Sequence, residues 1–150
     1  METKTEGIRK IAIGCDHGGY ELKKEIIQHL LDRGFDVLDQ GCDSTESCDY
    51  PIYAKKVTEK INMGLAELGI LICGTGIGMS MAANKQPGIR AALCHDTFSA
   101  KATREHNDAN VLCLGARVIG PGYALMIVDT FVDTAFSNDE RHKRRISLYS

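Results

Sequence analysis

The chain has 150 residues, which is a usual length for one domain, and 43% of them are hydrophobic. A formal net charge of −2, with both signs spread along most of the chain, gives no general preference for nucleic acid or for an anionic membrane surface. The apolar runs are far shorter than the roughly 20 residues of a membrane span, and the first six residues lack a signal peptide's apolar stretch. We therefore expect a soluble cytoplasmic protein with no nucleic-acid or membrane partner.

Short runs of strand-forming residues alternate with amphipathic segments of helical length along the whole chain. The expected strands are residues 8–15, 35–41, 69–73, 89–94 and 110–114, and the expected helices are 20–33, 51–66, 79–85, 99–105 and 122–136. Gly34 ends the first helix, Pro51 begins the second, and Pro121 interrupts the chain before the last. The pattern predicts one three-layer α/β/α domain over residues 1–150, built on a five-stranded parallel sheet of the Rossmann or flavodoxin-like class.

A strand order of 2-1-3-4-5 is expected for such a sheet. Ligands of open parallel sheets bind beyond the carboxyl ends of the strands, at the point where the strand order reverses. That point lies here between the first and third strands, which are followed by the turns Asp16-His17-Gly18-Gly19 and Cys73-Gly74-Thr75-Gly76. We expect these two polar, glycine-rich turns to meet.

The turn after the third strand combines a thiol, a hydroxyl and three glycines. Gly74, Gly76 and Gly78 differ in spacing from the dinucleotide-binding fingerprint, so alone they also fit an ordinary tight turn. Cys73 and Thr75 favour chemistry, because a thiol beside a helix start can act as a base or a nucleophile. A buried and inert Cys73 is almost equally compatible with the residues alone.

Other polar residues admit simpler interpretations. Asp16 beside His17 is typical of a helix cap, and His106-Asn107-Asp108 is ordinary chemistry for a turn between a helix and a strand. His29 and His95 are each interpreted as structural or solvated.

The six cysteines form no C-x-x-C pair and no spacing typical of zinc sites, so no metal site is predicted. Cys15, Cys94 and Cys113 are expected to be small buried hydrophobic residues. Cys42 and Cys48 are expected to be free surface thiols, with a redox role left open.

The C-terminal segment 137–150 contains Arg141-His142-Lys143-Arg144-Arg145, with four fixed positive charges. Such a run is most often a solvated tail. Guanidinium groups are also the preferred partners of phosphate, so a basic tail could complete a site on its own or on a neighbouring subunit. Arg117, near the end of the last strand, is a further candidate.

Seven motifs occur together in order, and their combination resembles type B ribose-5-phosphate isomerase. That family also includes the galactose-6-phosphate and allose-6-phosphate isomerases. The resemblance extends from about residue 11 to residue 145. The motifs are GCDHGG at 14–19, DYP at 49–51, CGTGIG at 73–78, AANK at 82–85, GIRA at 88–91, HNDAN at 106–110 and RH at 141–142.

The resemblance implies reversible isomerisation of D-ribose 5-phosphate and D-ribulose 5-phosphate through a cis-enediolate, in the non-oxidative pentose phosphate pathway. It implies no metal and no organic cofactor. It also implies a homodimer, with a tetramer left open, whose sites use residues of both subunits.

By the same resemblance, Cys73 is the base, Thr75 assists it, and His106 opens the sugar ring. Residues 137–140 (SNDE) depart from the glycines of many relatives, which leaves the path of the basic tail open. The implied substrate-binding residues are Asp16, His17, Tyr50, Gly74, Gly76, Ile77, Gly78 and Asn107, and the phosphate-binding residues are His17, Arg117, Arg141 and Arg145, with His142 as a further candidate.

Two alternatives stay open. The first is an isomerase of a six-carbon aldose 6-phosphate, because the phosphate-binding residues would be shared. The second is a non-catalytic nucleotide-binding module, which the sequence disfavours because it lacks G-x-G-x-x-G after the first strand and a P-loop lysine after the glycines.

Overall fold

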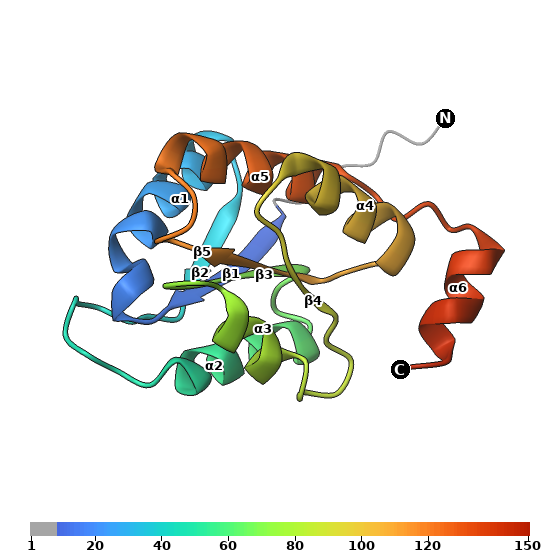
Figure 1. The fold of residues 1–150 in the computed structure, drawn as a ribbon, viewed down its shortest axis with the longest axis horizontal. Helices are drawn as coiled ribbons and strands as arrows, with labels where there is room; N and C mark the ends of the chain where they lie inside the picture. The colour runs from blue at the N-terminus through green and yellow to red at the C-terminus, as the bar shows by residue number, and fades with distance from the viewer. Residues whose placement is uncertain (1–8) are drawn as a thin grey trace.

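The computed structural model describes residues 9–150, so residue 8, where the first predicted strand begins, lies outside the described residues. Five parallel strands form one sheet with six α-helices around it (Figure 1). The strands are β1 (Lys10–Cys15), β2 (Asp36–Asp39), β3 (Leu68–Cys73), β4 (Ala91–Leu93) and β5 (Val111–Gly115). The helices are η1 (His17–Gly19, one 3₁₀ turn), α1 (Tyr20–Asp32), α2 (Tyr50–Asn62), α3 (Ile77–Ala83), α4 (Thr97–Asn107), α5 (Pro121–Asp133) and α6 (Glu140–Ser147). The predicted fold class is confirmed. Within residues 9–150, no helix is long and apolar enough to cross a membrane.

The strand order is β2-β1-β3-β5-β4, so the expected order 2-1-3-4-5 is wrong for the last two strands. The reason is the difference in burial between them. All five residues of β5 are buried, as expected for a strand covered on both faces. The three residues of β4 are half-buried or exposed, which suits a short edge strand. β1 and β3 are neighbours, so the predicted point of reversal is confirmed.

The placement of the helices follows from this order. Crossovers between parallel strands are right-handed, so connections that run toward opposite edges of the sheet lie on opposite faces. The steps β1 to β2 and β4 to β5 run one way, which places α1 and α4 on one face, and α5 packs with both of them. The steps β2 to β3 and β3 to β4 run the other way and place α2 and α3 on the second face (Figure 1).

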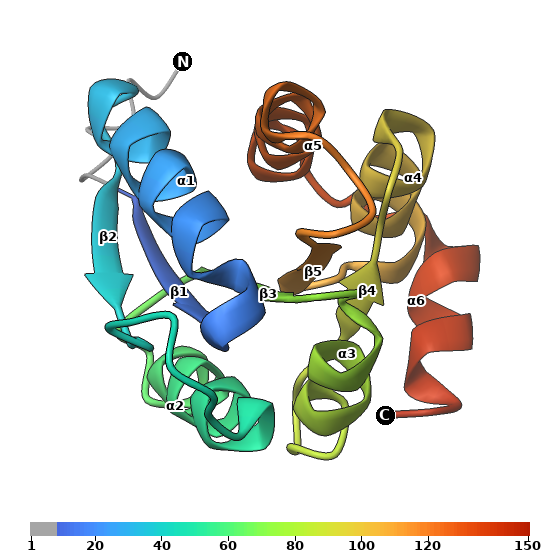
Figure 2. The same ribbon diagram turned by 60° about the vertical axis from the view of Figure 1, so that its left-hand side comes forward.

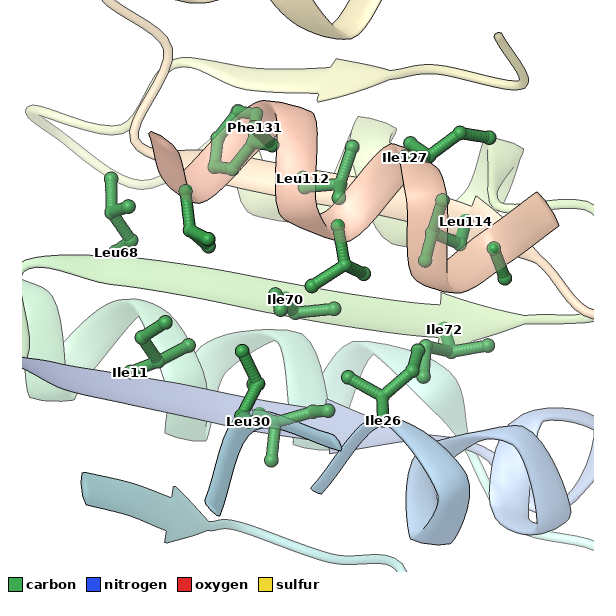
Figure 3. Close-up of a cluster of buried hydrophobic side chains, with 14 of the residues drawn as sticks. Ile11, Ile26, Leu30, Leu68, Ile70, Ile72, Leu112, Leu114, Ile127 and Phe131 are labelled. Carbon is green, nitrogen blue, oxygen red and sulfur yellow. The ribbon is translucent and has the colours of Figure 1, made fainter. Parts of the chain in front are cut away.

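The core has two parts, one on each face of the sheet, because strand side chains alternate between faces. Ile70 and Ile72 of β3 belong to the cluster under α1 and α5, shown in Figure 3. Leu71 and Cys73 belong to the smaller cluster under α2 and α3. The alternation therefore places the Cys73 side chain on the α2 and α3 face.

The segment predicted as a basic tail contains the helix α6, which the sequence analysis missed. Asp139 caps it by accepting a hydrogen bond from the N–H of Arg141 at 2.8 Å. Figure 2 shows α6 beside α4, outside the three layers. All residues of α6 are half-buried or exposed, so the hydrophobic core contributes little to its position.

We predict that Ile70→Ala lowers the free energy of unfolding by about 2–5 kcal/mol, because a fully buried side chain in a central strand is replaced by a cavity. The control is Leu31→Ala, at a side chain that is 48% exposed, where a change within about 0.5 kcal/mol is expected. Urea denaturation of both variants measures the difference. Equal losses would contradict the assignment of Ile70 to the core.

Candidate functional site

The turns after β1 and β3 touch, as predicted. The Asp16 carboxylate caps η1 by accepting a hydrogen bond from the N–H of Gly18 at 2.9 Å, and the Asp16 N–H donates to the carbonyl of Ile72 at 3.1 Å. A Cβ on Gly18 would lie 3.4 Å from the backbone nitrogen of Gly74. The cap interpretation of Asp16 is confirmed, and this cap holds the first turn against the second.

Cys73 is the last residue of β3 and is 5% exposed. The N–H of Gly76 donates a hydrogen bond to its Sγ at 3.1 Å. Gly76 has φ +77°, and a Cβ there would lie 2.5 Å from the side chain of Leu93, so glycine is required on both counts. The tight turn therefore aims a backbone donor at the thiol, which stabilises negative charge on the sulfur.

The turn after β5 is joined to the turn after β3. The N–H of Ala116 donates to the Cys73 carbonyl at 2.9 Å, and the N–H of Arg117 donates to the Gly74 carbonyl at 3.0 Å. A Cβ on Gly74 would lie 3.3 Å from Nη1 of Arg117. The exposed guanidinium thus lies directly beside the turn that carries Cys73 and the exposed Thr75.

Tyr50 and His17 are the remaining predicted residues beside these turns. The Tyr50 ring fills the space in front of Gly78, where an added Cβ would lie 2.6 Å from its Cζ. Nδ1 of His17 accepts a hydrogen bond from the N–H of Cys48 at 3.2 Å. A neutral imidazole that accepts at Nδ1 carries its proton on Nε2, so Nε2 is the nitrogen left to donate to a ligand. We call Asp16, His17, Tyr50, residues 73–78 and Arg117 the carboxyl-edge group.

The other predicted residues lie elsewhere. His106 and Asn107 are the last residues of α4, just before β5 begins, and both are exposed. The ring of His106 stacks on that of His142 in α6, with centroids 4.5 Å apart and an interplanar angle of 23°. We call His106, Asn107 and the α6 residues Arg141, His142 and Arg145 the amino-edge group.

The surroundings of His142 disfavour its protonated form. Desolvation lowers its pKa, and the charge of His106 lowers it further, while Asp139 opposes the shift. A cleft of about 730 Å³ opens next to the stack, between the loop before β4, the end of α4 and the C-terminus. Asn107, Arg90 and Tyr149 are among the residues that line it.

One chain does not unite the two groups. The register pairs Cys73 with Gly115 at the carboxyl end of β5, and Gly69 with Val111 at its amino end. His106 precedes this amino end, so the length of β5, roughly 15 Å at 3.3 Å per residue, separates it from Cys73. The sequence showed which residues were candidates, but only the topology places them at opposite edges of the sheet.

The burial of the cysteines corrects one expectation. Cys42 is buried and Cys48 is half-buried, so the prediction of two surface thiols is wrong for Cys42. Its loop folds back on β1, where the Sγ atoms of Cys15 and Cys42 lie 3.8 Å apart. Cys15, Cys94 and Cys113 are buried as predicted. Burial raises the pKa of Cys15 to about 12 and that of Cys94 to about 11, and it also raises the pKa of Cys113.

The remaining histidines have structural contacts. Nε2 of His29 lies 2.7 Å from the carboxylate of Asp129, which links α1 to α5. Nε2 of His95 accepts a hydrogen bond from the N–H of Gly115 at 3.1 Å, next to the point where Gly115 packs on the backbone of Thr75. Sequence analysis missed this support of the turn.

Between residues 9 and 150, no group of three or more His, Cys, Asp or Glu side chains is arranged to hold a metal ion.

Comparison with known proteins places the chain among sugar-phosphate isomerases. A family model described as Ribose/Galactose Isomerase matches residues 11–148. Ribose-5-phosphate isomerase B of Escherichia coli is 49% identical over 139 residues, 93% of each chain. D-erythrulose-4-phosphate isomerase of Pectobacterium atrosepticum is 47% identical over 84% of each chain. The structure of ribose-5-phosphate isomerase B from Clostridium thermocellum, 52% identical, superposes with a TM-score of 0.91 and covers 93% of each chain.

We predict that iodoacetamide at about pH 8 leaves Cys15, Cys94 and Cys113 unmodified in the folded protein. Their burial excludes the reagent, and their raised pKa values keep the reactive thiolate scarce until the pH is far higher. Half-buried Cys48 is expected to react before these three. Peptide mass spectrometry measures the order, with urea-unfolded protein as the control in which all six cysteines react. Early labelling of Cys15 or Cys94 would contradict the assignment.

Proposed function

Since this chain belongs to the ribose/galactose isomerase family, we propose that it interconverts D-ribose 5-phosphate and D-ribulose 5-phosphate, a step of the non-oxidative pentose phosphate pathway. Family membership confirms the resemblance drawn from the seven motifs. The observation that carries the proposal is the Cys73 thiol, whose Sγ accepts a hydrogen bond from the N–H of Gly76. The turn that contains this thiol packs against the Arg117 guanidinium. A base next to a phosphate-binding cation suits proton transfer on a phosphorylated sugar.

In the proposed reaction, the Cys73 thiolate removes the proton from C2 of the open-chain aldose. The electron pair of that C–H bond forms the C1–C2 double bond, and negative charge moves to the C1 oxygen. Transfer of the hydroxyl proton from the C2 oxygen to the C1 oxygen, together with return of the proton from the Cys73 thiol to C1, gives the ketose and restores the thiolate. Backbone N–H groups of the 74–78 turn stabilise the enediolate charge, and Thr75 hydrogen-bonds the sugar oxygens.

The remaining roles divide between binding and ring opening. His106 transfers the proton that opens the furanose ring, a task suited to an imidazole. Asp16, Asn107 and Tyr50 orient the sugar. His17, Arg117, Arg141 and Arg145 hold the phosphate.

We propose a homodimer in which each site combines the carboxyl-edge group of one subunit with the amino-edge group of the other. The two groups lie at opposite edges of a single sheet, so a two-fold pair completes two equal sites. The cleft beside Asn107 leaves room for a second chain to approach. Several large apolar side chains are exposed and available for association: Ile77, Met81, Phe98, Val118 and Met126.

A cytoplasmic location is part of the proposal. All six cysteines lie within residues 9–150 and are free. Free thiols persist in compartments that keep them reduced.

We predict that Cys73→Ala loses turnover of ribose 5-phosphate by about 10²-fold or more, because the proton acceptor is removed. Cys94→Ala is the control, since it removes a buried thiol at the end of β4 and is expected to keep nearly full turnover. Formation of ribulose 5-phosphate is measured with a chelator present, which also tests the expectation that no metal is needed. Full activity of Cys73→Ala would eliminate the assigned base.

We also predict that two inactive variants restore activity to each other. Cys73→Ala and His106→Asn are mixed, unfolded and refolded together, so that half of the dimers are mixed. A mixed dimer with composite sites contains one intact site of two, which gives about a quarter of wild-type activity for random pairing. Each variant refolded alone is the control. Absence of recovery, with mixed dimers demonstrated by mass, would place each site within one chain.

Substrate length is the remaining choice. The Pectobacterium relative is named for a four-carbon ketose phosphate, and the sequence analysis names a six-carbon aldose phosphate as the alternative. One extra hydroxymethyl group changes transition-state binding by only about 1–3 kcal/mol. We predict that kcat/KM is highest for ribose 5-phosphate when it is compared with allose 6-phosphate, galactose 6-phosphate and erythrulose 4-phosphate under identical conditions. A higher value for any of the others would reassign the substrate within the same family.

A further inference from the structure

Lys23 is a charged side chain that the proposed reaction does not use, although it is 1% exposed. It lies in the first turns of α1. Its Nζ donates to Oδ1 of Asp39 and to the carbonyl of Cys42, each at 2.7 Å, and it lies 5.6 Å from the centroid of the Tyr20 ring. A buried ammonium is costly unless it is paired and hydrogen-bonded, so the surrounding structure must hold it firmly.

Both acceptors belong to one connection, the segment that leads from the end of β2 to the start of α2. Oδ1 of Asp39 also accepts a hydrogen bond from the N–H of Gly41 at 2.9 Å. The N–H of Cys42 donates to the carbonyl of Cys15 at 3.0 Å, immediately before Asp16. Lys23 therefore connects the first residues of this loop to α1, and the Cys42 N–H connects them to the end of β1.

The far end of the same loop reaches the carboxyl-edge group. The N–H of Cys48 donates to Nδ1 of His17 at 3.2 Å, and two residues later Tyr50 places its ring against Gly78. Loop residues 43–47 are exposed, so few core contacts restrain the segment between its two ends. Cys48 itself packs against the core just before α2, so its N–H is placed by that contact together with the contacts that hold the start of the loop.

We propose that Lys23 is a positioning residue for substrate binding. Through Asp39 and the Cys42 carbonyl it holds the loop whose Cys48 N–H fixes His17 as the Nε2–H tautomer. His17 then presents a donor rather than an acceptor toward the phosphate. The phosphate-binding role of His17 in this inference rests on the proposed function, whereas the effect of Lys23 on the His17 ring does not.

The first test observes the His17 ring without any activity measurement. In ¹⁵N-labelled protein, the ring-nitrogen chemical shifts report the tautomer at a pH well above the ordinary histidine pKa of about 6.5. The wild-type protein is expected to show mainly the Nε2–H form, and Lys23→Met is expected to shift toward a mixture of both forms. Lys24→Met is the matched control, because Lys24 is the next residue on the same helix, pairs with exposed Glu21 and shares the contact with the Tyr20 ring, but is not among the donors to Asp39 or to the Cys42 carbonyl. It is expected to leave the His17 tautomer unchanged.

The second test separates binding from turnover. Lys23→Met is expected to raise KM for ribose 5-phosphate about tenfold, as when one hydrogen bond to a charged group is weakened, with kcat nearly unchanged. Lys24→Met is expected to retain both constants. In a His17→Ala background, Lys23→Met is expected to add little to KM, because both changes then affect the same contact.

Asp39→Asn provides a gentler perturbation if Lys23→Met fails to fold. It keeps the size of the acceptor but removes the charge that faces Lys23, and it should move the His17 shifts in the same direction by a smaller amount. An unchanged His17 tautomer in a folded Lys23→Met or Asp39→Asn protein would overturn the inference. So would a fall in kcat with unchanged KM. Absence of isomerase activity in the wild-type protein would instead refute the proposed function and leave the tautomer test standing.

Discussion

The structure depends on the pairing of β1 with β3, two strands whose following connections run to opposite sides of the sheet. Because these connections diverge, the two turns can meet at the carboxyl ends of the strands. Their contact demands small residues. A Cβ on Gly19 would lie 2.7 Å from the Ile72 carbonyl, and one on Gly115 would lie 2.7 Å from the Thr75 backbone. The glycines that made this region conspicuous in the sequence are thus required by close packing, and this packing brings Asp16, Cys73 and Arg117 together.

The same packing explains why Cys73 differs from the other buried thiols. Desolvation by burial is the largest cause that raises the pKa values of Cys15 and Cys94. Cys73 lies at the strand end, where the left-handed conformation of Gly76 turns an N–H toward its sulfur. His95 supports the neighbouring turn through the Gly115 N–H. The hydrogen bond from the Gly76 N–H is the feature that distinguishes the surroundings of the Cys73 sulfur.

Sequence patterns predicted the fold class and the meeting of the two turns, because both depend on local signals such as alternation, caps and glycines. They predicted the wrong order for β4 and β5. That order depends on which of the two short apolar runs the helices bury more completely. They also misplaced Cys42, because the return of its loop onto β1 is set by distant contacts such as that of Lys23. The helix α6 was missed because its charges dominate the segment, although Arg141 and Arg145 share one face at a spacing of four residues, and His142 and Ile146 share another.

The position of α6 connects the fold to the proposed assembly. A helix of eight residues is marginal in water without tertiary contacts. Within one chain its contacts include the stack of His142 on His106, while Arg141 and Arg145 remain exposed. The helix that carries them is held next to His106, before the amino end of β5, whereas the thiol of the same chain lies at the carboxyl end. A second subunit that supplies the carboxyl-edge group would bring a phosphate to these cations and bury the exposed face of the helix. Completion of the site and stabilisation of α6 would then be the same event.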